Sequence, residues 1–210
     1  MARILLVDDH AVVRKGLRSI LESADDYFTI SEAGTSEQAL EQCRAHHFDV
    51  VILDINLPGR NGIGMLKRLR KEWPELPILM LSIYPEEQYG LRVLKSGARG
   101  YLNKSAAPEK LVDAVRNVLR GRRYFSPELT ERLLDDLVGN NHMQDHQALS
   151  DREYQVFTMI INGMTPSEIA SRLSLSVKTI HTHRARILRT MGLKNNAELM
   201  RYAMEHGLLN

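Results

Sequence analysis

The sequence predicts an α/β domain built on a five-stranded, doubly wound parallel sheet, followed by a small all-α domain of four helices. Two observations lead to this prediction. In the first 120 residues, five short apolar runs alternate with five segments of helical periodicity, which is the pattern of consecutive βα units. The last 60 residues carry helical patterns throughout, separated by residues that start and stop helices.

The apolar runs predict the strands, and their composition predicts the order of the sheet. The first, third and fourth runs are apolar throughout, as central parallel strands are. Phe28-Thr29-Ile30-Ser31 alternates apolar and polar residues, so the second strand is placed nearer an edge. Strands are expected near residues 3–7, 28–33, 49–53, 77–81 and 99–102, with helices near 11–24, 36–46, 63–72, 86–96 and 107–120.

Punctuation along the chain predicts three parts: a first domain over residues 1–121, a linker over 122–147 and a second domain over 148–210. Ser126-Pro127 predicts the start of one linker helix, which is expected to reach Val138. Residues 142–147 have no periodicity and are expected to be flexible. The helices of the second domain are expected to begin at four N-cap residues and to stop at two glycines: Ser150, Thr165, Ser176 and Asn195, with Gly163 and Gly192.

Composition limits the class of protein. The single cysteine, Cys43, excludes an intramolecular disulfide and a cysteine-rich zinc site, and it fits a cytoplasmic location. No apolar stretch approaches the roughly 18 residues that span a bilayer, and the N-terminus reaches an acid by Asp8, so neither a membrane partner nor a signal peptide is expected.

Polar side chains follow four of the predicted strands. Asp8 and Asp9 end the first strand, Asp54 the third and Ser82 the fourth, and Lys104 follows the fifth. The carboxyl ends of parallel strands share one edge of a sheet, where ligands bind. Three carboxylates, a hydroxyl and an ammonium would suit a divalent cation, Mg²⁺ above all, and a phosphoryl group. The alternative is that each acid caps the helix after it, which is about as plausible for any one residue but much less so for the whole set.

The same residues, with Pro58-Gly59 and Tyr101, resemble the receiver domain of bacterial two-component response regulators over residues 2–120. The resemblance implies a flavodoxin-like receiver in which Asp54 accepts a phosphoryl group from a histidine kinase. It also implies that Lys104 contacts that group, that Ser82 moves toward it and that Tyr101 swings inward behind Ser82. The implied ligands of Mg²⁺ are Asp8, Asp9, Asp54 and the backbone carbonyl of Asn56.

Phosphorylation would act as a switch, because it adds charge and three acceptor oxygens at one point. Ser82 and Lys104 would gain a new partner, and a pre-existing equilibrium between two states would shift. The surface expected to change covers residues 84–104.

The second domain is basic where the first is nearly neutral, which suggests a polyanionic partner. Between Glu168 and Glu198 there are six basic residues and no acid. On the helix expected over 177–191, one stripe is apolar (Val177, Ile180, Ile187, Met191), and the opposite face carries Lys178, Thr182, Ala185, Arg186 and Arg189, with His181 at its flank. Such a helix fits the major groove of DNA. The alternative is a solvated charged face.

The wider pattern, Leu149-Ser150 with Arg152-Glu153, then Glu168-Ile169-Ala170 and Gly192-Leu193, resembles the LuxR-type helix-turn-helix of NarL/FixJ-class regulators over residues 148–208. The resemblance implies that the third helix of the domain enters the major groove and that the fourth dimerises. The residues implied in dimerisation are Leu199, Tyr202 and Ala203, with Met204 as a further candidate. The expected DNA contacts are Thr165, Lys178, Thr179, His181, Thr182, Ala185, Arg186, Arg189 and Lys194.

The expected function is therefore a phosphorylation-controlled transcription factor that binds duplex DNA as a homodimer and catalyses only its own phosphotransfer and dephosphorylation. Two rivals differ in testable ways. An aspartate-nucleophile phosphatase needs a second acid two residues after the nucleophile, where this chain has Asn56. A regulator that works through protein partners without phosphorylation would tolerate the loss of Asp54, and it ranks lower because the acids are intact.

Overall fold

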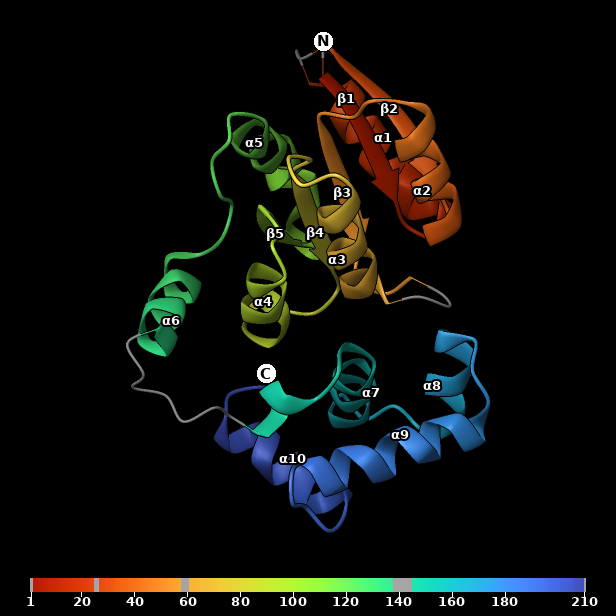
Figure 1. Cartoon of the computed structure of the whole chain (residues 1–210), viewed down its shortest axis with the longest axis vertical. Coiled ribbons are helices and arrows are strands. Elements are labelled where there is room, and N and C mark those ends of the chain that lie inside the picture. Colours follow the sequence, from red (N-terminus) through yellow and green to blue (C-terminus); the bar gives the residue numbers. More distant parts are fainter. Residues whose placement is uncertain (1, 25–26, 58–60, 138–144, 210) are drawn as a thin grey trace. The chain divides into compact units, whose positions relative to one another are not determined.

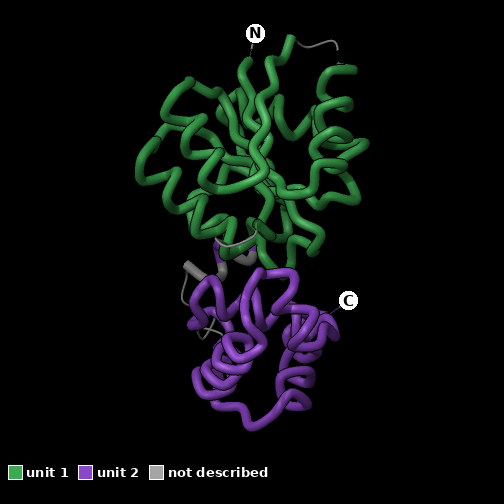
Figure 2. Tube along the Cα trace, turned by 90° about the vertical axis from the view of Figure 1, so that its right-hand side faces the viewer, with its two compact units in different colours: residues 1–130 green, residues 131–210 purple. Residues whose placement is uncertain are grey.

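The computed structural model describes residues 2–24, 27–57, 61–137 and 145–209. Contacts divide the chain into two compact units, one ending at Thr130 and one beginning at Glu131 (Figure 2). The first unit is therefore longer than the domain predicted over residues 1–121, because the start of the linker packs with it. Each unit is described separately.

The first unit is built on a parallel sheet with strand order β2-β1-β3-β4-β5 (Figure 1). This order confirms that the second strand lies at an edge and that the first, third and fourth lie inside. The strands are β1 (Ala2–Val7), β2 (Phe28–Ala33), β3 (Val50–Asp54), β4 (Ile78–Ser82) and β5 (Gly100–Asn103). β3 and β4 are buried along their whole length, which explains why their runs are apolar without alternation.

Helices cover both faces of this sheet, as a doubly wound fold requires. One face packs on apolar residues of α1 and α5, including Leu17, Leu21, Leu111 and Val115, to form a continuous core with Ile52. The helices of the unit are α1 (Ala11–Glu22), α2 (Ser36–Ala45), α3 (Gly62–Glu72), α4 (Glu86–Lys95) and α5 (Ala107–Leu119), with a 3-10 turn η1 (Lys104–Ala106) before α5.

The linker helix α6 (Pro127–Leu137) begins where the sequence predicts it. The Ser126 hydroxyl accepts the backbone N–H of Leu129 at 3.1 Å and so caps the first turn. The predicted end at Val138, and residues 142–144 of the segment expected to be flexible, lie outside the described residues.

The second unit contains the four predicted helices, α7 (Asp151–Ile161), α8 (Pro166–Leu173), α9 (Val177–Thr190) and α10 (Asn196–Glu205). Capping boxes at Ser150 and Thr165 fix the starts of α7 and α8, as predicted. Ser176 and Asn195 cap α9 and α10 through the N–H groups of Thr179 and Glu198.

One expectation for the linker is wrong. Residues 145–147 were predicted to be flexible, but they form a 3-10 turn, η2 (Asp145–Ala148), whose His146 is buried. Its Nδ1 lies 2.9 Å from the Tyr202 hydroxyl, and its ring stacks on Phe157. The sequence lacks periodicity here because a single aromatic anchor, rather than a repeating stripe, holds the turn to the helices.

Within the described residues, no helix is both long and apolar enough to cross a membrane.

Candidate functional site

The predicted polar residues do meet at the carboxyl edge of the sheet. Asp54 is the last residue of β3 and lies opposite Leu81 of β4 in the register, so Ser82 is one step beyond it. Asp8 directly follows β1, and Lys104 directly follows β5. Asp8 and Asp54 are each only 1% exposed, so both carboxylates are held in a poorly solvated place.

The acids at this edge are not explained by helix capping. α1 begins after His10, whose side chain makes no cap hydrogen bond within the described residues; Oδ1 of Asp8 accepts the backbone N–H of His10 itself, which precedes the helix, at 2.8 Å. Asn61 caps α3, accepting the N–H of Ile63 at 2.8 Å, so Asp54 has no capping role there. A charge in such surroundings is costly unless something compensates it.

Lys104 supplies part of that compensation. Its Nζ lies 2.6 Å from Oδ2 of Asp8 and 2.8 Å from Oδ2 of Asp54. Burial lowers the pKa of the Lys104 ammonium, but Asp54 and Asp8 raise it by more, so its pKa is above the usual value and it stays charged. The residue thus joins two acids that lie far apart in the sequence.

The ionised form of the Asp54 carboxyl remains disfavoured even with Lys104 beside it. Burial raises its pKa most, the Lys104 ammonium opposes that rise, and the Asp8 carboxylate adds to it, leaving the pKa above the usual value. One ammonium cannot balance the carboxylates gathered here. A cation with a preference for oxygen ligands would relieve the remaining excess.

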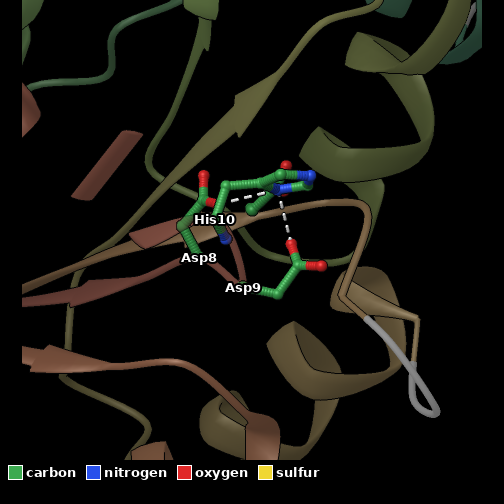
Figure 3. Close-up of side chains that lie close together, drawn as sticks. Asp8, Asp9 and His10 are labelled. Carbon is green, nitrogen blue, oxygen red and sulfur yellow. Dashed lines mark hydrogen bonds and ion pairs between the residues drawn. The ribbon is translucent and has the colours of Figure 1, made fainter. Parts of the chain in front are cut away.

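His10 is a member of this cluster that sequence reasoning missed. Figure 3 shows its ring turned toward the two preceding acids; Nδ1 lies 2.8 Å from Oδ1 of Asp9 and 3.3 Å from Oδ1 of Asp8. Ligand atoms of Asp8, Asp9, His10 and Asp54 all lie within 4.8 Å of one another. The signal available in the sequence was its position directly after the acid pair.

This donor set fits a divalent cation. Lys104 pairs with two of the three carboxylates, those of Asp8 and Asp54, and both are almost fully buried. Oxygens of all three carboxylates lie within the span of one coordination sphere. The backbone of Asn56 reaches the same place, since its N–H bonds to the Asp54 carboxylate. The predicted turn at Pro58-Gly59 lies outside the described residues.

Ser82 and Tyr101 lie behind the acids and are linked through the turn that follows β4. Ser82 is fully buried, and its Oγ accepts the N–H of Tyr84 at 3.0 Å. The hydroxyl of Tyr101 donates to the carbonyl of Tyr84 at 2.7 Å, and its side chain is turned inward with 4% exposed. Asn103 also donates to that carbonyl, at 3.0 Å.

The second unit presents the predicted helix-turn-helix. α8 and α9 are joined by residues 174–176, in which Ser174 adopts a left-handed conformation with φ 53°. Ile180, Ile187 and Met191 are buried, as predicted, but Val177 is 40% exposed and does not belong to the apolar stripe. It is in the first turn of α9, before the helix meets the core.

Most of the predicted DNA-contacting residues are exposed. Thr179 is the exception, because it is half-buried and its hydroxyl lies 2.8 Å from Ser176 Oγ at the helix start. Arg184 is turned away, and its Nε donates to Asn196 at 2.6 Å, which ties α9 to α10. The exposed members of the set are Thr165, Lys178, His181, Thr182, Ala185, Arg186, Arg189 and Lys194.

The stripe predicted for dimerisation faces the interior. Leu199, Tyr202 and Ala203 are 0%, 8% and 0% exposed, and Tyr202 contacts His146 within the unit. Helical periodicity found an apolar stripe correctly but could not tell a core face from a partner face. The exposed residues of α10 include Ala197, Arg201 and Met204, which follow helical spacing, and Met204 is 69% exposed.

Comparisons with known proteins agree with both units. Residues 4–116 match the response regulator receiver domain, and residues 147–203 match the bacterial regulatory proteins of the luxR family. The chain is 35% identical to the response regulator UvrY of Escherichia coli, over 100% of this chain and 97% of that one. It is 37% identical to the oxygen regulatory protein NreC of Staphylococcus carnosus, over 99% of each.

A solved structure has the same architecture. RcsB from Salmonella enterica serovar Typhimurium, bound to the promoter rprA in the presence of the phosphomimetic BeF3-, matches with a TM-score of 0.64 and 25% identity. The match covers 96% of this chain and 97% of that chain.

Proposed function

Since the chain belongs to the response regulators that join a receiver domain to a LuxR-type DNA-binding domain, we propose that Asp54 accepts the phosphoryl group of a sensor histidine kinase and thereby controls DNA binding. The observation that supports this assignment most is the ion pair of Lys104 with a buried aspartate at the ligand-binding edge of the sheet. Transfer breaks the phosphorus–nitrogen bond of the donor and forms a phosphorus–oxygen bond to Asp54.

The neighbouring residues have distinct roles in this proposal. Asp8, Asp9, Asp54 and the Asn56 carbonyl hold Mg²⁺, which when bound offsets the negative charge of the incoming group. Lys104 moves part of its contact from Asp8 to a phosphoryl oxygen, and the Ser82 hydroxyl donates to another. The receiver catalyses only its own phosphotransfer and dephosphorylation, and it works in the cytoplasm, where promoter DNA is present.

Labelling tests the proposed acceptor. The full chain is incubated with acetyl phosphate and Mg²⁺, and intact mass and peptide mapping report the modified residue. We expect one phosphoryl group on wild type and none on Asp54→Asn, with Asp49→Asn, a nearby receiver acid outside this site, labelled as wild type. Labelling of Asp54→Asn at the wild-type level would refute the assignment.

We further propose that the exposed face of α9 reads duplex DNA. Lys178, Arg186 and Arg189 give this face positive charge, and its small residues Thr182 and Ala185 allow close approach to a groove. If Arg189 contacts phosphate, Arg189→Ala lowers affinity for all sequences and reduces the salt slope by about 1; if it reads a base, the loss is confined to one position of the site. Fluorescence anisotropy with a promoter fragment at several salt concentrations measures both.

The matched control for this experiment is Arg172→Ala. Arg172 is an exposed arginine of the same unit, but it lies on α8, outside both the face of α9 and the exposed face of α10. Its removal should leave the salt slope unchanged. Equal salt slopes for the two variants, with no position of the site at which Arg189→Ala alone loses affinity, would refute the α9 assignment.

A homodimer is the expected DNA-bound form, and the exposed face of α10 is its proposed contact in this unit. Met204→Asp places a charge at the centre of that face without disturbing the core, because the side chain is 69% exposed. We expect weaker binding to DNA that carries two half-sites and unchanged binding to DNA that carries one. Identical affinities of Met204→Asp and wild type for the paired site would place the contact elsewhere.

The same experiments separate the proposal from a regulator that works without phosphorylation. If Asp54→Asn binds promoter DNA as acetyl phosphate-treated wild type does, charge on Asp54 does not control the output. A phosphatase is disfavoured because Asn56 stands where a second acid would be needed.

A further inference from the structure

The start of the linker is built into the receiver at the edge of its sheet. The backbone N–H of Tyr124 donates to the carbonyl of Arg99 at 2.9 Å, and the N–H of Tyr101 donates to the carbonyl of Tyr124 at 2.9 Å. Tyr124 thus forms a parallel bridge with Gly100 and extends the sheet beyond β5. An edge that would otherwise be unpaired is occupied by the linker.

A second contact holds the first turn of α6 against α4. Leu129 is 3% exposed. The backbone N–H of Ser126 donates to the carboxylate of Glu86, with the nearer oxygen at 3.2 Å. These contacts explain why the first unit ends at Thr130 rather than at the predicted boundary near residue 121.

Two glycines make room for these contacts. A Cβ on Gly90 would stand 2.6 Å from Cγ of Glu86 and 2.8 Å from Cδ2 of Leu129, and a Cβ on Gly100 would stand 2.8 Å from Cδ1 of Leu79 and 2.9 Å from Cβ of Tyr124. Gly90 is inside a helix, where glycine costs about 0.5–1 kcal/mol relative to alanine. The close approach of Leu129 explains why glycine stands at this helical position in spite of that cost.

The docked linker is connected to the proposed phosphorylation site by consecutive hydrogen bonds. Ser82 Oγ accepts from the N–H of Tyr84, and the Tyr84 carbonyl accepts from the hydroxyl of Tyr101. The backbone N–H of the same Tyr101 then donates to Tyr124 of the linker. A parallel route runs through the ring of Tyr84, which stacks on Tyr89 of α4 at 5.3 Å, next to Gly90.

We propose that residues 124–130 are the element that senses the state of Asp54, and that phosphorylation releases them from α4 and β5. This inference rests on the proposed function of Asp54. When the Ser82 hydroxyl turns toward a phosphoryl oxygen, its Oγ leaves the N–H of Tyr84, and the turn that begins α4 shifts. Glu86 and Gly90 move with α4, so Ser126 loses its hydrogen bond to Glu86 and Leu129 loses its packing against Gly90. The freed linker then lengthens the tether that joins the receiver to the DNA-binding unit.

Because contiguous contacts alone do not establish coupling, the test measures the response of the linker itself. Hydrogen exchange with mass spectrometry is followed on peptides covering residues 122–130 in the full chain, with and without acetyl phosphate and Mg²⁺. Typical coupling between two sites is 5- to 150-fold. We expect exchange of these peptides to become faster by roughly that factor when Asp54 is modified.

Two variants test the route. Tyr101→Phe removes the hydroxyl that bonds to Tyr84 and keeps the ring; we expect the difference between modified and unmodified protein to shrink. Its control is Tyr27→Phe, on an exposed tyrosine of the same unit. Gly90→Ala crowds Leu129, so we expect fast exchange in both states. Its control is Gly64→Ala in α3, where nothing lies within 4 Å of the added Cβ.

The mass of the intact chain, measured in the same samples, distinguishes failure of the linker inference from failure of the proposed function. Modification of Asp54 with unchanged or slower exchange of residues 122–130 would overturn the linker inference and leave the proposed function standing. Absence of modification would overturn both. A Gly90→Ala variant that is labelled and exchanges as wild type would also overturn the inference. The inference is supported if the exchange of residues 122–130 no longer responds to modification in Tyr101→Phe and Gly90→Ala but still responds in Tyr27→Phe and Gly64→Ala.

Discussion

Replacing Lys104 by methionine tests the electrostatic account of the site. The ammonium lies 2.6 Å and 2.8 Å from carboxylate oxygens of Asp8 and Asp54. At an effective dielectric constant of about 20, each of these pairs is worth roughly 6 kcal/mol of Coulomb attraction. The variant also avoids the cost of burying the ammonium, so the net loss is smaller. Removing one partner of a buried pair typically costs about 3–5 kcal/mol, and we expect a loss in that range near neutral pH.

The loss should depend on pH in a defined direction. Without Lys104, burial and repulsion from the Asp8 carboxylate raise the pKa of the Asp54 carboxyl in the folded state further, because the ammonium no longer opposes them. A raised pKa gives stability at low pH that disappears as the pH rises through the folded-state value. Lys104→Met should therefore differ from wild type less at pH 5 than at pH 7.5. Mg²⁺ should recover part of the loss at pH 7.5, because it replaces the missing positive charge.

Urea denaturation followed by tryptophan fluorescence measures this effect. Trp73 is the one tryptophan of the sequence and belongs to the receiver, so its signal reports on that unit. Lys110→Met, on an exposed lysine of α5, is the control and should change stability by less than about 0.5 kcal/mol. A loss below about 1 kcal/mol for Lys104→Met at pH 7.5, or an equal loss at both pH values, would refute the reasoning.

Two further predictions concern other parts of the chain. Gly62→Ala places a Cβ 2.1 Å from the carbonyl oxygen of Asp54, so labelling by acetyl phosphate should slow by roughly 100-fold. The control Gly64→Ala should be labelled at the wild-type rate and should gain about 0.5–1 kcal/mol of stability. Equal labelling rates for the two variants would contradict this prediction. Burial lowers the pKa of His183, so stability of the second unit is fully present above pH 6.5 and is lost as the pH falls through the folded-state pKa. His183→Gln should flatten the dependence of the melting temperature on pH between 7.5 and 5, and Thr182→Ala, on the exposed face of the same helix, should not.

The sequence by itself determined the elements and the edge at which the site lies. Strand and cap signals depend on a few adjacent residues, so the apolar run before Asp54 and the capping boxes at Ser150 and Thr165 could be located without a structure. The meeting of Asp8, Asp54 and Lys104 followed from a general property of parallel sheets.

Only the tertiary structure decided which surfaces are covered. Leu199 and Tyr202 carry the periodicity of a contact face, but whether a helix stripe packs on its own domain or on a partner depends on neighbours distant in sequence. His146 contacts the hydroxyl of Tyr202, 56 positions away, and Leu129 packs against Gly90, 39 positions away, so neither contact could be read from local sequence. Local sequence encodes backbone conformation and polarity, whereas burial of one particular side chain is settled by the packing of the whole unit.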